Sequence, residues 1–243
     1  MRVNILDVPF DNVTRAEALA RLLGFLEQDG CKLVCTPNPE MVMAAAGDAE
    51  FMRVLNSADL VVPDGIGVVL ASRLIGQPLK ERVAGCDLMF ALLDSVKGTG
   101  KTVFFLGGKP GVAELAAENM REKYPGLGII GFRDGYFNDE TERELLNELT
   151  RLKPDVLLVG LGMGRQEKWI DRNRSLPVRL AVGVGGSLDV MSGTVKRAPV
   201  IFQRLGLEWF YRLILQPSRV WRMLPLPVFV IKVVKRRNYT RKM

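Results

Sequence analysis

The feature that most constrains this chain is a series of short, almost continuously apolar runs separated by longer amphipathic segments. Such runs are typical of parallel β-strands that are covered on both faces. They lie at 32–36, 59–64, 102–108, 128–132, 155–162 and 179–186. Segments of helical periodicity lie at 14–28, 40–55, 86–97, 111–123, 139–152 and 165–174, and Thr14 with Glu17 gives a capping-box pattern at the first of them. This alternation predicts an α/β fold, a Rossmann-like open parallel sheet with helices on both faces.

The pattern changes after about residue 195. Residues 196–243 contain twelve Lys or Arg and one acid, Glu208, so this segment carries a net charge of +11. The whole chain carries +7, which leaves −4 for residues 1–195. Aromatic residues such as Trp209 and Trp221 alternate with the basic ones at helical spacing, as in elements that lie at a membrane interface. We therefore predict a Rossmann-like domain at 1–195 and a basic, aromatic, helical, membrane-associating appendage at 196–243.

The tail sequence has two other interpretations. A helical hairpin that only closes the core is an ordinary structure for such a sequence. Nucleic acid is not predicted as a partner, because no nucleic-acid-binding motif accompanies the charge.

The residues that are missing also limit the chemistry. The chain has no histidine, and its three cysteines, Cys31, Cys35 and Cys86, form no CxxC pair. This composition disfavours a zinc site and is typical of a reducing compartment. An enzyme with this sequence needs a general base other than imidazole. We also expect a cytoplasmic location, since the N-terminus lacks the apolar core of a signal peptide and no apolar run reaches the ~18 residues of a transmembrane helix.

Polar, glycine-rich loops follow several of the predicted strands. Ligands of an open parallel sheet bind outside the carboxyl ends of the strands, where glycines let the backbone approach and helix N-termini offer N–H groups to anions. We therefore predict a nucleotide or another phosphorylated ligand at this edge. The candidate contacts in these loops are Gly107, Gly108, Lys109, Tyr136, Arg165, Gly185, Gly186 and Asp189.

Two short motifs approach nucleotide fingerprints without matching them. GTGKT at 98–102 resembles the end of a P-loop, but it precedes its strand and has Ser95 at the first glycine position. GLGMGR at 160–165 resembles a dinucleotide fingerprint, but Arg165 replaces its third glycine, so a dinucleotide-dependent enzyme is a less favoured alternative.

No Asp-x-Asp triplet occurs, and we predict neither a metal nor another cofactor. If the reaction releases a diphosphate, as in sugar-nucleotide enzymes, its charge must then be met by basic side chains and backbone amides. The candidates are Arg82, Arg165, Arg212, Arg219 and Arg222, each of which taken alone also fits an ordinary surface arginine.

Six blocks follow one another within residues 3–225: TPNPEMVMAA, VVPDGIGVVLASRLIGQPLKERVAGCDLM, FFLGGKPGVAELAAENM, PDVLLVGLGMGRQEKWI, AVGVGGSLDVMSGTVKRAP and GLEWFYRLILQPSRVWRM. Together they resemble the WecG/TagA/CpsF glycosyltransferases, and within that family they are most similar to the TagA type. The resemblance implies an inverting, metal-independent transfer of N-acetylmannosamine from UDP-N-acetylmannosamine. The implied acceptor is undecaprenyl-diphosphate-linked N-acetylglucosamine, and the product is the wall teichoic acid linkage unit or a related surface polysaccharide. The enzyme would be peripheral on the inner face of the plasma membrane.

The same resemblance assigns roles to single residues. It implies that Asp64 is the catalytic base, although Pro-Asp-Gly after an apolar run is on its own most often a tight bend. It implies active-site roles for Thr36, Asn38, Arg82 and Gln166. It further implies that Arg212, Arg219 and Arg222 in the tail cover the site and contact the diphosphate.

Several alternatives stay open at this point. Relatives with the same blocks use UDP-N-acetylmannosamine uronic acid or UDP-hexoses, so the donor sugar is not fixed. A non-enzymatic adapter that binds through its basic tail is a further hypothesis, but it leaves the polar strand-end loops unexplained. The expected partners are a UDP-sugar donor, a polyprenyl-diphosphate-linked sugar acceptor and an anionic membrane surface. The apolar helical patch of the tail also allows a homo-oligomer.

Overall fold

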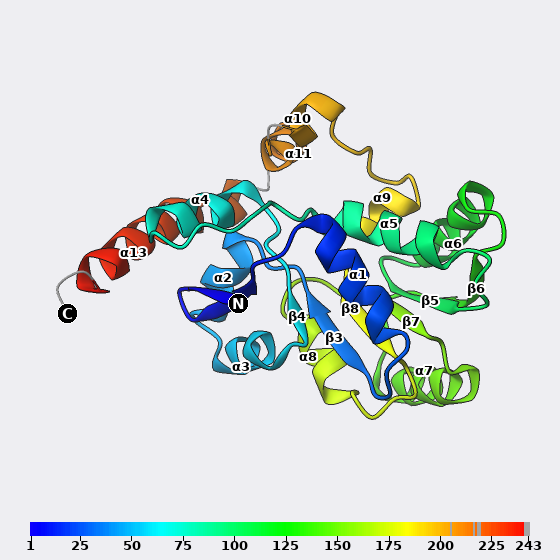
Figure 1. The fold of residues 1–243 in the computed structure, drawn as a ribbon. Coiled ribbons are helices and arrows are strands. Elements are labelled where there is room, and N and C mark those ends of the chain that lie inside the picture. The colour runs from blue at the N-terminus through cyan, green and yellow to red at the C-terminus, as the bar shows by residue number, and fades with distance from the viewer. Residues whose placement is uncertain (205, 216, 218–219, 241–243) are drawn as a thin grey trace.

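Six parallel strands form the centre of the molecule in the computed structural model, which describes residues 1–204, 206–215, 217 and 220–240 (Figure 1). The strands are β3 (Lys32–Cys35), β4 (Leu60–Val61), β5 (Thr102–Gly107), β6 (Gly128–Arg133), β7 (Val156–Gly160) and β8 (Leu180–Gly183). Their order across the sheet is β4-β3-β8-β7-β5-β6. The predicted parallel sheet and all six predicted strands are confirmed, although the run at 59–64 contributes only a two-residue edge strand.

Helices cover both faces of this sheet, as predicted (Figure 1). On one face lie α1 (Arg15–Phe25), α5 (Gly85–Val96), α6 (Val112–Lys123) and α9 (Ser187–Met191). On the other lie α2 (Pro39–Ala45), α3 (Ala49–Ser57), α4 (Ile66–Leu74), α7 (Asp139–Leu152) and α8 (Arg165–Arg172). The capping box of α1 is also present, because the Glu17 N–H donates to Thr14 Oγ1 (3.2 Å) and the Thr14 N–H donates to Glu17 Oε2 (2.8 Å).

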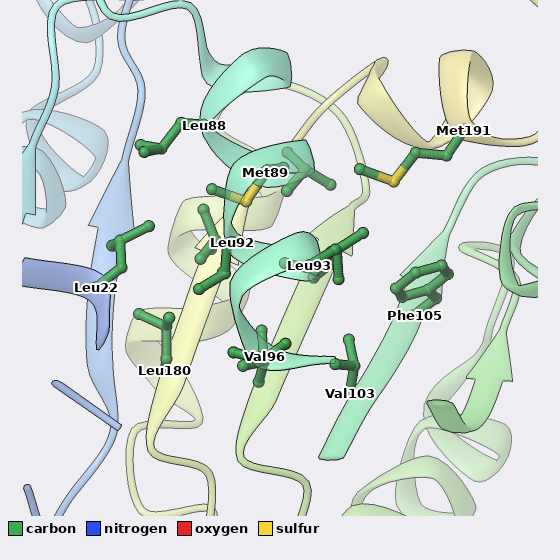
Figure 2. Close-up of a cluster of buried hydrophobic side chains, with 14 of the residues drawn as sticks. Leu22, Leu88, Met89, Leu92, Leu93, Val96, Val103, Phe105, Leu180 and Met191 are labelled. Carbon is green, nitrogen blue, oxygen red and sulfur yellow. The ribbon is translucent and has the colours of Figure 1, made fainter. Parts of the chain in front are cut away.

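The two helical layers explain why the strands have no polar alternation. Successive side chains of a strand point to opposite faces. Val103 and Phe105 of β5 therefore pack with the α5 side, where Figure 2 shows them beside Leu93 and Val96. Phe104 and Leu106, between and after them in the chain, are equally buried in the cluster on the opposite face.

An N-terminal hairpin that the sequence analysis did not predict lies beside the edge strand. It consists of β1 (Arg2–Ile5) and β2 (Val8–Asp11), which pair antiparallel. Its two-residue turn, Leu6 and Asp7, has φ values of 49° and 70°. Asp11 is buried, and its Oδ2 accepts a hydrogen bond from the Val61 N–H (3.0 Å), which satisfies a backbone donor of the short strand β4.

Two other helical segments differ from the prediction. The segment 40–55 is not one helix, because the chain breaks between α2 and α3 and Asp48 Oδ1 accepts from the Phe51 N–H to cap α3 (3.0 Å). Helix α4 follows the turn at Asp64 and was not predicted.

Most of the described part of the tail is helical, as predicted. It contains α10 (Val200–Arg204), α11 (Glu208–Leu215), α12 (Val220–Met223) and α13 (Pro225–Thr240). Helix α13 lies along α4 and contacts α2, and its Phe229 and Val233 are buried in the core cluster of that face (Figure 1). Near its end, Arg236 donates two hydrogen bonds to the Asp7 carboxylate, at 2.7 and 2.8 Å.

Candidate active site

The turn that carries Asp64 is fixed on both sides by backbone hydrogen bonds. Asp64 follows β4, and its N–H donates to the carbonyl of Pro37 in the loop after β3 (3.2 Å). The neighbouring Pro63 carbonyl accepts from the Val83 N–H (2.9 Å). Gly65 has a φ of 94°, a conformation that favours glycine, and α4 starts directly after it. The half-buried carboxylate of Asp64 therefore stands at the carboxyl edge of the sheet on a braced turn.

The loop after β3 brings Thr36 and Asn38 to the same place. Asn38 caps α2, since its Oδ1 accepts from the Met41 N–H (3.0 Å). This bond orients the amide and leaves its Nδ2 as a donor. Gly85 packs directly on Thr36, because a Cβ at Gly85 would lie 3.1 Å from the Thr36 hydroxyl oxygen. Strand end and helix start together hold both polar side chains in position.

Gln166 belongs to a buried polar network at the start of α8. Its Nε2 donates to Glu167 Oε1 (2.7 Å), and its Oε1 accepts from the Gly185 N–H (3.1 Å). Glu167 Oε2 accepts from the Gly164 N–H (2.8 Å), and the side chain is fully buried. Burial raises the pKa of Glu167, although the hydrogen bond from Gln166 opposes the shift. The network fixes the Gln166 amide and the loop after β8 relative to each other.

Arg82 connects this region to the tail. Its Nη2 donates to Glu208 Oε1 at the start of α11 (3.2 Å) and lies 3.3 Å from the Gln203 carbonyl. Gly206, between α10 and α11, packs on α4, where an added Cβ would lie 2.9 Å from Cβ of Ile66. The first two tail helices are thus in contact with both the Arg82 loop and the start of α4.

These groups surround one cleft of about 1080 Å³. Of the predicted residues, those that line it are Thr36, Asn38, Asp64, Arg82, Gln166, Gly185, Gly186 and Asp189. Further lining residues come from the tail, among them Glu208, Trp209, Leu226 and Val230. The cleft therefore joins the carboxyl ends of β3, β4, β7 and β8 to the C-terminal helices.

Comparison with known proteins gives the family. The model of the glycosyl transferase WecG/TagA/CpsF family matches residues 3–243. The chain belongs to this family. The resemblance that the six sequence blocks suggested is thereby confirmed.

Several bacterial relatives of this WecG/TagA/CpsF chain carry the same name, N-acetylglucosaminyldiphosphoundecaprenol N-acetyl-beta-D-mannosaminyltransferase. The relative from Bacillus spizizenii W23 is 43% identical over 90% of this chain and 84% of its own length. The one from Bacillus subtilis 168 is 41% identical over 87% of this chain and 82% of its own. The one from Staphylococcus aureus MRSA252 is 34% identical over 99% and 95%.

Five predicted contacts of the WecG/TagA/CpsF chain lie elsewhere, at the ends of β5, β6 and β7. Gly107 packs on the backbone of Gly160, and the Gly108 N–H donates to the Gly160 carbonyl (3.0 Å). The guanidinium of Arg165 lies over the ring of Phe137, 5.3 Å from its centroid. These residues, with the exposed Lys109 and Tyr136, are not among the described residues that line the cleft.

The predicted tail arginines have a different status. Arg212 and Arg222 lie in α11 and α12, of which only the backbone is described at these two positions, and Arg219 lies outside the described residues. Their roles stay predictions. No helix in the described part of the chain is long and apolar enough to cross a membrane.

The sequence analysis missed several polar residues in or beside the cleft, among them Glu167, Glu208 and Cys86. Glu167 was signalled by its spacing from Gly164, where it accepts the N–H of the helix cap, a capping-box position. Glu208 is the single acid in a strongly basic tail, which marks it as a residue with a specific cationic partner. Cys86, which is partly exposed in the cleft, follows Gly85 and had no signal of its own.

Proposed function

We propose that this chain transfers N-acetylmannosamine from UDP-N-acetylmannosamine to undecaprenyl-diphosphate-linked N-acetylglucosamine, in wall teichoic acid linkage-unit synthesis or a related surface polysaccharide pathway. The observation that carries the proposal is the gathering of Asp64, Thr36, Asn38 and Gln166 in one cleft at the carboxyl edge of the sheet. The relatives named for this transfer favour this donor over a uronic acid or hexose donor, and favour a glycosyl transferase over a dinucleotide-dependent enzyme.

In the proposed reaction, Asp64 acts as the general base. Its carboxylate takes the proton of the acceptor hydroxyl while the hydroxyl oxygen attacks the anomeric carbon of the donor sugar. The bond from that carbon to the diphosphate oxygen breaks on the opposite face, so the configuration inverts and UDP leaves with the bonding electrons. No step requires imidazole, which agrees with a chain that lacks histidine.

The remaining residues of the cleft would orient the donor and stabilise the leaving group. The side-chain amides of Asn38 and Gln166 are each held in place by a hydrogen bond to the protein, through Oδ1 of Asn38 and through one N–H of Gln166. Each amide therefore keeps a pre-oriented N–H for a sugar hydroxyl or acetamido group. Backbone amides of Gly185 and Gly186 and the guanidinium of Arg82 lie in the same cleft and suit the diphosphate. Arg212, Arg219 and Arg222 would add positive charge from the tail.

The tail is proposed to place the enzyme on the inner face of the plasma membrane. Trp209, Phe210, Ile214 and Trp221 are exposed in its helices, within a segment whose net charge is +11. Each basic residue near an anionic bilayer contributes about 1 kcal/mol, so several together give reversible attachment. This proposal keeps 1–195 as the UDP-sugar-binding catalytic domain and 196–243 as the membrane-associating appendage. The same exposed residues also suit pairing of two copies.

Turnover of a donor panel tests the proposal. The purified chain is incubated with a lipid-diphosphate-linked N-acetylglucosamine and, in turn, UDP-N-acetylmannosamine, its uronic acid, UDP-N-acetylglucosamine or UDP-glucose, with EDTA present. We expect UDP release and a β-linked disaccharide with UDP-N-acetylmannosamine alone. Preferred use of another donor would replace the proposed sugar. A thermal shift with NAD but none with UDP or UDP-sugars would overturn the proposed function.

A further inference from the structure

The cleft has two walls of different chemistry. The loops and helix starts at the strand ends contribute the polar side chains, among them Asn38, Asp64 and Gln166. The other wall comes from α4 and α13 and contains no charged or polar side chain among its described lining residues. From α4 it takes Ile66, Leu70 and Leu74, and from α13 it takes Leu226, Phe229, Val230 and Val233. We call these seven residues the α4–α13 groove.

The spacing of these residues shows that each helix presents one apolar face to the cleft. In α4 they recur every four residues, and Gly67 and Ala71 complete the same face without adding a polar group. In α13 they recur at intervals of three and four residues. The stretch from Leu226 to Val233 spans about 10 Å of helix, at 1.5 Å per residue.

Helix α13 is held firmly enough to form a wall. Phe229 and Val233 are 2% and 1% exposed and belong to the core cluster that includes α2 and α4. The bidentate pair of Arg236 with Asp7 sets the direction of the helix at its other end. Val230 of α13 and Leu70 and Leu74 of the adjacent α4 nevertheless stay 49%, 48% and 38% exposed. Large apolar side chains that remain open in a cleft indicate an apolar ligand.

The apolar surface does not stop at the cleft. Val228, Ile231 and Val234 of α13 are also exposed and do not line the cleft, so the helix carries apolar residues on its outer side as well as on the side that lines the groove. A ligand with a hydrocarbon chain can therefore enter from the outer surface and place its polar end near Asp64. The relatives' shared name specifies an acceptor of this kind, with a sugar diphosphate at one end and undecaprenol at the other.

We propose that the α4–α13 groove binds the first isoprene units of the polyprenyl-diphosphate-linked acceptor. The inference rests on the proposed function and adds to it a hydrocarbon subsite on the protein itself, separate from contact of the tail with the bilayer. Binding of the hydrocarbon chain of the acceptor in the groove removes the exposed parts of Leu70, Leu74 and Val230 from water. It also directs the acceptor sugar toward the polar wall.

The test is a series of acceptors that differ only in chain length. N-acetylglucosamine diphosphate carrying a methyl, geranyl or farnesyl group is assayed in detergent-free buffer without membranes, below the critical micelle concentration. In the wild type, KM falls as the chain lengthens. Leu74→Gln and Val230→Gln, both at partly exposed positions, raise KM for the farnesyl acceptor by about tenfold, which corresponds to 1.4 kcal/mol, and flatten the dependence on chain length. Leu115→Gln, a similarly exposed leucine on α6, serves as the matched control and keeps that dependence.

Other outcomes would overturn the inference. If both groove variants keep the wild-type dependence on chain length, the groove does not bind the chain. If they lose only vesicle binding, the residues face the bilayer, and if they change only the oligomeric state in gel filtration, they pair two copies. Calorimetric binding of the farnesyl acceptor does not depend on turnover. Failure of the proposed function, seen as no transfer by the wild type to any acceptor, is therefore distinguishable from failure of the groove. Melting temperatures of all variants exclude unfolding as the cause.

Discussion

At one end of the sheet the loops after β3, β4 and β8 surround a cleft, whereas at the other end the loops after β5 and β6 pack against each other. Both ends carry an aspartate followed by a glycine, Asp64-Gly65 after β4 and Asp134-Gly135 after β6. The Gly135 N–H donates to the Gly108 carbonyl (2.9 Å), and a Cβ at Gly135 would lie 3.3 Å from that oxygen. Similar residues thus line a cleft in one place and brace two loops in the other. Which of the two structures forms depends on the strands that lie beside each loop in the sheet.

The strongest test of this contrast is a pair of identical substitutions at its two ends. Asp64→Asn should lower kcat by about 10²–10⁴-fold, because it removes the proposed base and retains the size of the side chain. Asp134→Asn should change kcat by less than about threefold, since among the described residues the Asp134 carboxylate accepts just one hydrogen bond, from the Tyr136 N–H of its own turn (2.8 Å). Steady-state kinetics with saturating donor measure both effects. Equal losses in the two variants would show that the contrast is wrong.

A smaller effect tests whether the buried Glu167 acts through Gln166. A glutamine at 167 offers one oxygen to two donors, the Gln166 amide and the Gly164 N–H, so one of them loses its acceptor. Glu167→Gln should therefore lower kcat/KM by about tenfold to a hundredfold, as for the loss of a hydrogen bond to a charged group. The same change should cost little in a Gln166→Ala background, because the two effects are coupled.

The control for this cycle is Glu142→Gln. Glu142, in α7, accepts through its Oε1 a hydrogen bond from Nε1 of Trp169, which lies in α8 like Glu167 (2.6 Å). Glu142 is outside the described lining of the cleft. Its substitution should affect stability without coupling to Gln166→Ala. Additive losses from Gln166→Ala and Glu167→Gln would argue that Glu167 has only a structural role.

The pH dependence of stability gives a third test. Burial raises the pKa of Glu167, so the native state binds this proton more tightly than the unfolded chain, whose glutamates titrate near about 4.3. As pH falls through the raised native pKa, the wild type therefore gains stability relative to Glu167→Gln, and the gain is complete below the unfolded pKa. Urea unfolding of both proteins between neutral and acidic pH measures the difference. A difference that is constant or has the opposite sign would contradict the raised pKa.

The smallest expected effects are at the far end of the sheet. Lys109→Ala and Tyr136→Ala should change KM for UDP-N-acetylmannosamine by less than about twofold, because both residues are exposed and lie outside the described lining of the cleft. Gly186→Ala should raise the KM for UDP-N-acetylmannosamine by about tenfold, since it adds a methyl group to a residue that lines the cleft. The φ of −75° at Gly186 allows alanine without backbone strain. A tenfold change in the Lys109 variant would instead extend the donor site across β7 to β5.

Sheet order explains which parts of the site were predictable. The apolar runs identify the strands, and the polar residues after them identify candidate side chains such as Thr36 and Asp64. Their lateral arrangement depends on long-range pairing, which no local pattern contains. In the structure β8 inserts between β3 and β7, so Gly185 lines the same cleft as Asp64, whereas Lys109 is not among the described lining residues.

Local features of the sequence also explain why the β1–β2 hairpin and α4 were not predicted. The β1–β2 turn uses Leu6 and Asp7 at positive φ, without the glycine that usually signals a hairpin, and Pro9 within β2 is untypical of a strand. Helix α4 contains Gly67 next to β-branched residues, a weak helical sequence. That glycine is required by packing, because a Cβ there would lie 2.7 Å from Cγ of Pro39.

The position of the groove residues along the chain has a consequence for biosynthesis. The predicted polar residues of the cleft lie between Thr36 and Asp189, whereas the α13 side of the apolar wall begins only at Leu226. Because a ribosome makes the chain from its N-terminus, a nascent protein can complete the polar wall before α13 has emerged. A partly synthesised chain would thus have its proposed base in place and still lack the α13 side of the proposed α4–α13 groove.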